Sequence, residues 1–161
     1  MSFTGREYTI EFENVTIAAA SGDSDLFSID PATDKPVAIK SVVIKTTSEL
    51  QEAQEEWLRL RIIRGHTTVG SGGAAATARP LAPGDAAFGG SARTNDTAIA
   101  SAGTAVNLWS DALQVRNGYE LFRAPEDYFW TAGAEFIVVR LMAAVTDDVI
   151  ANGTIDIVEI P

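Results

Sequence analysis

The stretch Glu55–Gly73, EEWLRLRIIRGHTTVGSGG, decides the fold class of this chain. Apolar side chains at positions 58, 60 and 62 alternate with Arg59 and Arg61, and this two-residue period is typical of a strand with one buried face. We expect the leucine and isoleucine side chains to point into the core. Trp57 and the two arginines then belong to the opposite face of the same strand.

A second strand with the same period lies near the N-terminus. Tyr8, Ile10 and Phe12 alternate there with threonine and glutamate, which predicts one apolar face and one face in water. At Asn14 the pattern slips by one residue. A slip of this kind requires a bulge or a bend, because it moves the following side chains to the other face.

Further strands are predicted from β-branched and apolar runs between turn signals. The run EFIVVRLMAA, residues 135–144, should direct its odd-numbered side chains from Ile137 to Ala143 into the core and Arg140 away from it. Asn117-Gly118 and Asn152-Gly153 are turn signals. The other expected strands cover residues 26–29, 36–45 with a bulge near Ser41, 104–113 and 154–160.

Only one stretch, Ser48–Glu56, has a composition that favours a helix. Its few apolar residues do not form a continuous apolar face through which such a helix could pack on the rest of the protein. An acidic loop or a single helical turn is therefore the alternative for this stretch.

Glycine, alanine, serine and threonine dominate residues 65–103. Pro80 and Pro83 forbid a continuous helix or a central strand there, so we expect one long loop, an arm within the domain. A loop of this length is uncommon in a compact domain and is usually functional or disordered. We expect it to be mobile in an isolated subunit and ordered in an assembly.

These patterns together predict about eight to ten strands separated by turns, without a sustained helix. The fold class that fits them is all-β, an antiparallel β-sandwich that resembles a jelly roll, with one long Gly/Ala-rich loop. The length of 161 residues suits a single domain over 1–161 that can bury a real core.

Composition narrows the classes of function. The net charge of −10 disfavours nucleic acid and anionic membrane surfaces as partners, since binding to polyphosphates depends on lysine and arginine. The chain has no cysteine, so disulfides, thiolate zinc sites and cysteine nucleophiles are excluded. We also expect no signal peptide, since the N-terminus, MSFTGREYTIEF, has no basic region followed by an apolar run. No membrane helix is expected, because no apolar run approaches about 20 residues.

The motifs that could indicate catalysis are incomplete. After Gly65 and Gly70 a phosphate-binding loop requires lysine, but Ser71 follows. His66 is the sole histidine, and no nucleophile-elbow pattern accompanies it, so we expect a loop residue and not a catalytic one. The acidic pairs lack the spacing of an EF-hand and are expected to be solvated turns: Asp23/Asp25, Glu126/Asp127 and Asp147/Asp148. No cofactor, metal or catalytic residue is predicted.

Five aromatic residues remain as candidates for binding: Trp57, Trp109, Tyr128, Phe129 and Trp130. They could form an aromatic platform for a sugar. We favour burial in the core or in an interface, because large aromatic side chains dominate the energetics of both.

Four segments carry a resemblance to a known group of proteins: EEWLRLRIIRGHTTVGSGGAA, RPLAPGDAA, TAIASAGTAV and EFIVVRLMAA. They are similar to small proteins encoded in tailed-phage and prophage genomes, often near head genes. Those proteins share a strand that ends in Arg-Ile-Ile-Arg-Gly and is followed by histidine and a glycine-rich loop. The resemblance extends over most of the chain, from about residue 8 to residue 160.

The nearest functional analogy for that group is with the jelly-roll cement or decoration proteins on the outside of phage heads. It implies a non-enzymatic virion protein that is assembled in the host cytoplasm, binds the major capsid protein and forms a homo-oligomer, a dimer or a trimer. From the residues themselves, the expected partner contacts are Arg79, Phe88, Arg93, Trp109, Tyr128 and Trp130. The alternatives are a receptor- or carbohydrate-binding module of a phage tail or secreted protein and, third, a hydrolase that uses His66.

Overall fold

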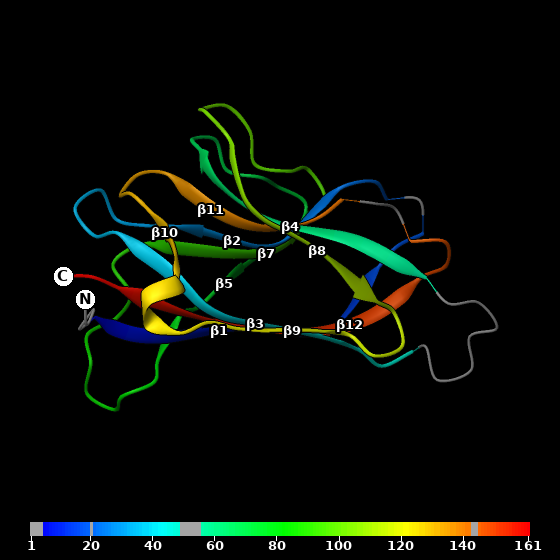
Figure 1. Ribbon diagram of the computed structural model, residues 1–161, viewed down its shortest axis with the longest axis horizontal. Coiled ribbons are helices and arrows are strands. Elements are labelled where there is room, and N and C mark those ends of the chain that lie inside the picture. Colours follow the sequence, from blue (N-terminus) through cyan, green and yellow to red (C-terminus); the bar gives the residue numbers. More distant parts are fainter. Residues whose placement is uncertain (1–4, 20, 49–55, 143–144) are drawn as a thin grey trace.

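The computed structural model of the protein describes residues 5–19, 21–48, 56–142 and 145–161 (Figure 1). Two six-stranded antiparallel sheets stack face to face, and their facing side chains form the hydrophobic core. No α-helix occurs among the described residues, where a 3₁₀ turn, η1 (Pro125–Asp127), is the one helical element. The predicted fold class, an all-β antiparallel sandwich, is therefore confirmed.

The first sheet, called sheet I, has the strand order β10-β3-β12-β1-β6, and β9 also pairs with β3. The bounds of its strands are β1 Arg6–Ile17, β3 Val37–Thr46, β6 Arg79–Pro80, β9 Tyr119–Phe122, β10 Phe129–Thr131 and β12 Val149–Glu159.

The second sheet, called sheet II, has the order β5-β7-β2-β11-β4-β8. Its strands are β2 Ser24–Asp30, β4 Trp57–His66, β5 Ala74–Ala76, β7 Ser91–Asp96, β8 Val106–Gln114 and β11 Phe136–Leu141.

The order of the strands confirms jelly-roll topology. The chain alternates between the sheets from β1 to β4, and later strands return beside earlier ones, so that β12 lies next to β1 and β11 next to β2. The resulting orders, β1-β12-β3-β9 and β2-β11-β4-β8, are the two interleaved Greek keys of this fold. The hairpin-like additions β5, β6 and β7 extend the two sheets on the side of β1 and β2.

The register of the central strand β4 is confirmed. Its apolar side chains at 58, 60 and 62 are buried in the core, whereas Arg59 is exposed and Trp57 is 62% exposed. The alternation follows from the pleat, which sends successive side chains to opposite faces of the sheet.

Three local predictions near turns and bulges are confirmed. The bulge at Asn14 is confirmed, because the pairing of β1 with β12 shifts between Phe12 and Val15 and Asn14 has a φ of 55°. The bulge near Ser41 is also confirmed by a shift in the pairing of β3 with β12. The turn at Asn117-Gly118 is confirmed, with φ of +77° at Gly118.

The turn predicted at Asn152-Gly153 is wrong, since β12 runs through both residues without interruption. Gly153 lies opposite Phe12 on β1, and a Cβ atom at this glycine would lie 2.3 Å from the Phe12 ring. The glycine therefore makes room for an aromatic side chain of the core, a role of glycine in strands that sequence alone does not separate from a turn.

Strand β11 is buried on both faces. Its side chains at 137, 139 and 141 enter the main core, as predicted, while Ala143 lies outside the described residues. The opposite face is covered as well: Phe136 and Val138 form a second cluster with Ile63 and Ala100. Arg140 does point away from the main core, but it is buried beneath that cover.

The segment 65–103, expected to be one long loop, contains three strands, β5, β6 and β7. β7 pairs with β2 over Ser91–Asp96 and buries Ala92 in the main core. The expectation of a loop without strands of its own is therefore wrong, because pairing with β2 gives regular structure to residues whose local pattern is weak. Residues 49–55 of the helix candidate Ser48–Glu56 lie outside the described residues.

We predict that Leu60→Ala lowers the free energy of unfolding by about 2–5 kcal/mol, because it leaves a cavity in the core of the sandwich. Denaturant unfolding followed by tryptophan fluorescence measures the loss. Arg59→Ala, on the exposed face of the same strand, serves as the control and should cost much less. A larger loss for Arg59→Ala than for Leu60→Ala would contradict this assignment of faces.

Candidate interaction surfaces

The six predicted contact residues do not lie together in the structure. One lateral side of the sandwich, formed by β1, β6, β5 and β7, carries Arg79 on β6, Arg93 on β7 and Phe88 between these two strands. Trp109 on β8 and Trp130 on β10, with Tyr128 just before β10, belong to the opposite lateral side. The six residues therefore divide between two sides of the sandwich.

On the first side, the three predicted residues are engaged within the subunit. Phe88 packs on Tyr8 with ring centroids 5.3 Å apart. Arg93 donates to both carboxylate oxygens of Asp96, at 2.8–3.1 Å, and Arg79 pairs with Glu11. That they also contact a partner stays a prediction.

The segment between β6 and β7 is held down by a buried carboxylate. Glu159, 1% exposed, accepts hydrogen bonds from the Tyr8 hydroxyl at 3.3 Å and from the Gly89 backbone amide at 2.9 Å. The Tyr8 hydroxyl also lies 3.0 Å from the carbonyl of Ala86. These contacts fix part of the segment that the sequence suggested to be a mobile arm.

On the second side, an arginine covers the aromatic cluster. Trp109 and Phe129 pack with centroids 5.9 Å apart, and the guanidinium of Arg123 lies over both rings, 5.2 Å and 4.5 Å from their centroids. Trp109 Nε1 donates to the hydroxyl of Tyr119 at 3.1 Å. Arg123 thus covers one face of each of these two rings, which a sugar platform on them would have to leave open.

The exposed Trp57 does not belong to that cluster, since it pairs with Gln114 at the far end of β8. The sequence detected the aromatic residues but missed Arg123, because the contact between Arg123 and Trp109 depends on how β8 and β9 cross between the two sheets.

A buried ion pair lies on the outer face of sheet II. Arg140 Nε donates to Asp25 Oδ1 at 2.6 Å, and both side chains are nearly or fully buried. Ala100 completes the group: its amide donates to Asp25 at 2.7 Å, and its carbonyl accepts from Arg140 at 3.0 Å. The prediction that Asp25 belongs to a solvated turn is wrong. The signal that could have found the pair was Arg140, a single charge inside an apolar run.

Ala100 belongs to a projection that we call the tip, defined as residues 66–73 and 97–105. Its two segments pair at Thr68 with Ser101 and at Ser71 with Ala98, and they extend beyond sheet II (Figure 1). At its base, a Cβ atom on Gly65 would lie 2.1 Å from a backbone oxygen of residue 104, so the close approach of the segments requires glycine. The tip contains no Asp, Glu, Lys or Arg.

His66 lies at the base of the tip and is 7% exposed. Its Nδ1 is 3.3 Å from the carbonyl oxygen of Ala102, and its Nε2 has no hydrogen-bond partner. His66 is thus the last residue of β4 and not a loop residue, although it lies within hydrogen-bonding distance of a backbone carbonyl. The absence of catalysis through this histidine stays a prediction.

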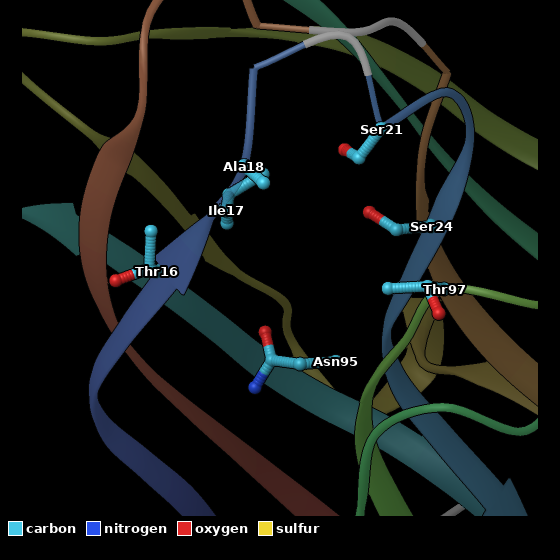
Figure 2. A pocket seen from close by; sticks show the side chains of 7 residues that line it. All are labelled: Thr16, Ile17, Ala18, Ser21, Ser24, Asn95 and Thr97. Carbon is cyan, nitrogen blue, oxygen red and sulfur yellow. The ribbon is translucent and has the colours of Figure 1, made fainter.

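A small recess of about 70 Å³ lies between the end of β1, the start of β2 and the end of β7 (Figure 2). The side chains of Ser24 and Asn95 contribute polar atoms near it that are buried and have no hydrogen-bond partner. The recess could hold a few water molecules, which commonly satisfy such groups. Its other lining residues are Thr16, Ile17, Ala18, Ser21 and Thr97.

Neither a cluster of metal ligands nor a membrane-spanning helix occurs in the described residues. Across residues 5–19, 21–48, 56–142 and 145–161, no three His, Cys, Asp or Glu side chains gather as metal ligands would. Within the same residues, no helix has the length and apolarity needed to cross a membrane.

Comparisons with known proteins give little further information. No family model matches the sequence, and no curated protein matches it. Among solved structures, the chain is similar to a chain of the T13 IBDV viral particle, with 14% identity and a TM-score of 0.23. The match covers 99% of this chain but 40% of that one, and a likeness at this TM-score carries no conclusion.

We predict that Arg140→Met lowers the free energy of unfolding by about 3–5 kcal/mol, because it leaves the buried Asp25 carboxylate without its cation. Chemical denaturation measures the loss. The double variant Asp25→Asn with Arg140→Met should recover part of it, since no charge then stays buried. Arg59→Met is the control on an exposed site and should change stability by less than about 0.5 kcal/mol. A loss below about 1 kcal/mol for Arg140→Met would contradict the importance of the pair.

A second prediction concerns Tyr119. Burial, reinforced by the Asp111 carboxylate, raises the pKa of the Tyr119 phenol from 10.0 to about 12, although the hydrogen bond from Trp109 opposes the rise. In the unfolded chain the phenol ionises near pH 10, so the folded state holds the proton more tightly. The stability that this group contributes is complete below pH 10 and is lost as the pH rises toward 12.

Melting temperatures from pH 9 to pH 12 test this assignment, with Tyr119→Phe as the comparison. The Phe variant should lose less stability over that range than the wild type, because it has no phenol to ionise. Parallel curves for the two proteins would show that the Tyr119 phenol is not held in its neutral form.

Proposed function

We propose that the protein is a non-enzymatic structural protein of a phage virion, which decorates or cements the outside of the capsid by binding the major capsid protein. It is assembled in the host cytoplasm and acts as a homo-oligomer. The observation that carries the proposal is a jelly-roll framework that projects an uncharged tip held from below by a buried ion pair.

A decoration protein has to fit a preformed surface without losing much conformational freedom when it binds. The tip is tied to sheet II through Ala100, Asp25 and Arg140, so much of this ordering already exists in the free subunit. Because the tip carries no ionisable Asp, Glu, Lys or Arg, its burial against a capsid would desolvate no such charge.

The resemblance to phage head-associated proteins supports the same proposal from the sequence. The contact residues predicted there divide between two sides of the sandwich, and Arg79, Phe88 and Arg93 are engaged within the subunit. We therefore favour the tip as the capsid-binding surface and keep the side of Phe88 as the competing surface.

The alternative function is a receptor- or carbohydrate-binding module of a phage tail or secreted protein. The placement of Arg123 over Trp109 and Phe129 argues against an open aromatic platform on that side. A glycan array distinguishes the two functions: saturable binding to one class of glycan would favour the alternative.

The proposal is tested with particles produced by the genome that encodes this chain. Quantitative mass spectrometry should find the protein in a fixed ratio to the major capsid protein, and purified protein should rebind to particles that lack it. Absence from purified particles, or no rebinding, would overturn the proposal.

We predict that Val69→Asp in the tip reduces rebinding by about tenfold or more, because it buries an unpaired charge in the contact. Leu81→Asp is the matched control, since Val69 is 49% exposed and Leu81 47% exposed, but Leu81 lies on the side of Phe88. If Leu81→Asp abolished rebinding and Val69→Asp did not, the competing surface would be the capsid contact.

A further inference from the structure

The edge strands of the two sheets differ greatly in length. An unpaired strand edge offers a row of backbone donors and acceptors to another chain, and monomeric proteins shorten or interrupt such edges. Three of the four sheet edges in the described residues are formed by short strands. β5 has 3 residues, and β6 has 2 and includes Pro80. The third edge is shared by β9 with 4 residues and β10 with 3, since both pair with β3. β8, at the end of sheet II, presents a long edge of 9 residues. In the described residues, the part of β1 beyond β6 also has no strand on its outer side, but the bulge at Asn14 interrupts it.

The β8 edge also lacks most of the usual protection. It contains no lysine, arginine or proline, and Asp111 is its one charged residue. Exposed side chains lie along much of it, among them Val106, 42% exposed, and Ser110. Two features do interrupt the edge: the pairing with β4 shifts between Ile62 and Ile63, and the Ala112 amide donates to Asp111 Oδ1 at 2.8 Å. In the described residues, no named strand pairs with its outer side, and a single bridge from Gly118 occupies that side at the last residue, Gln114.

We propose that a second copy of this chain pairs with β8 in an antiparallel arrangement, so that sheet II continues from one subunit into the other. Addition of a strand to a free edge is an established mode of protein recognition. In a dimer with twofold symmetry, both subunits use the same edge. If residue i of the first copy lies opposite residue j of the second, then residue j of the first copy lies opposite residue i of the second.

The sequence of β8 is compatible with pairing to itself. Overlap of the whole strand, Val106–Gln114, places its midpoint Ser110 opposite Ser110 of the second copy. In this register Asp111 lies opposite Trp109 of the other copy, so the single charge of the strand does not face its own equivalent. Like charges directly opposite each other would destabilise the pair.

A second copy suits the edge better than a strongly charged partner segment. Apart from Asp111 the strand carries only uncharged side chains, and the 9-residue match in length follows automatically when the partner is β8 itself. This inference does not depend on capsid binding, because it concerns the free protein and uses a surface different from the tip.

The experiment uses a residue that would lie opposite itself. Sedimentation equilibrium over a range of concentrations should show a reversible dimer of the wild-type protein. Ser110→Lys and Ser110→Asp should each weaken that dimer by about fivefold or more, since each places like charges directly across the twofold axis. An equal mixture of the two variants should restore dimerisation, because the charges then attract.

The controls are Ala75→Lys and Ala75→Asp on β5, the short edge at the other end of sheet II. They change the net charge by the same amounts and should leave the dimer unaffected. Hydrogen exchange gives an independent reading: amides of residues 106–113 should exchange more slowly at high than at low protein concentration. Thermal unfolding verifies that each variant is folded.

Several outcomes would overturn the inference. A wild-type protein that stays monomeric at every concentration would do so, as would Ser110 variants that dimerise like the wild type. Failure of the mixed variants to dimerise would exclude the proposed twofold register. Protection of β8 only on capsid particles would show that the occupant of this edge is another protein.

Discussion

Burial of β11 on both faces is the constraint on which the outer architecture of this protein depends. β11 lies in the middle of sheet II, and sheet I covers the apolar side chains on its inner face. The side chains on its outer face are apolar too and must also be covered. The tip provides the missing cover by placing Ala100 in the cluster with Phe136 and Val138. Arg140 and Asp25 then lie between sheet II and the tip. Separation of the tip from the sheet would expose both the cluster and the ion pair, and it would break the hydrogen bonds that join Ala100 to Asp25 and Arg140.

This arrangement explains how a segment made of glycine, alanine, serine and threonine can be ordered. Fixing each backbone residue costs about 1–2 kcal/mol, and small side chains recover little of that through burial. The tip is instead held by backbone pairing of its two segments and by the charged group at its base. The outer surface of the tip is therefore not needed to hold the tip in place, which is compatible with a role in contacting a partner.

The sequence predicted those features that depend on neighbouring residues along the chain. Alternation in β4 revealed the buried face at Leu60, and the slip at Asn14 revealed the bulge. It failed where a distant residue decides the outcome. Gly153 is in a strand because the Phe12 ring needs its space, and Asp25 is buried because Arg140 lies opposite it on β11. The division of the predicted contact residues between two sides has the same cause, because nothing local shows that β6 and β10 lie on opposite sides of the sandwich; their contact with a partner stays a prediction.

The order of elements along the chain links the two surfaces on which the proposals rest. Residues 97–105 of the tip lead directly into β8 at Val106, so the same continuous segment first covers the outer face of sheet II and then forms its free edge. A strand added to that edge would continue the sheet on which the tip is seated. Since the ion pair and Ala100 fix the tip relative to β11, and β4 lies between β11 and β8, pairing of two subunits would also fix the separation and direction of their two tips. A dimer built in this way would present two tips in a geometry set by strand pairing, and a preformed pair of contacts binds a repeating surface more tightly than either contact alone.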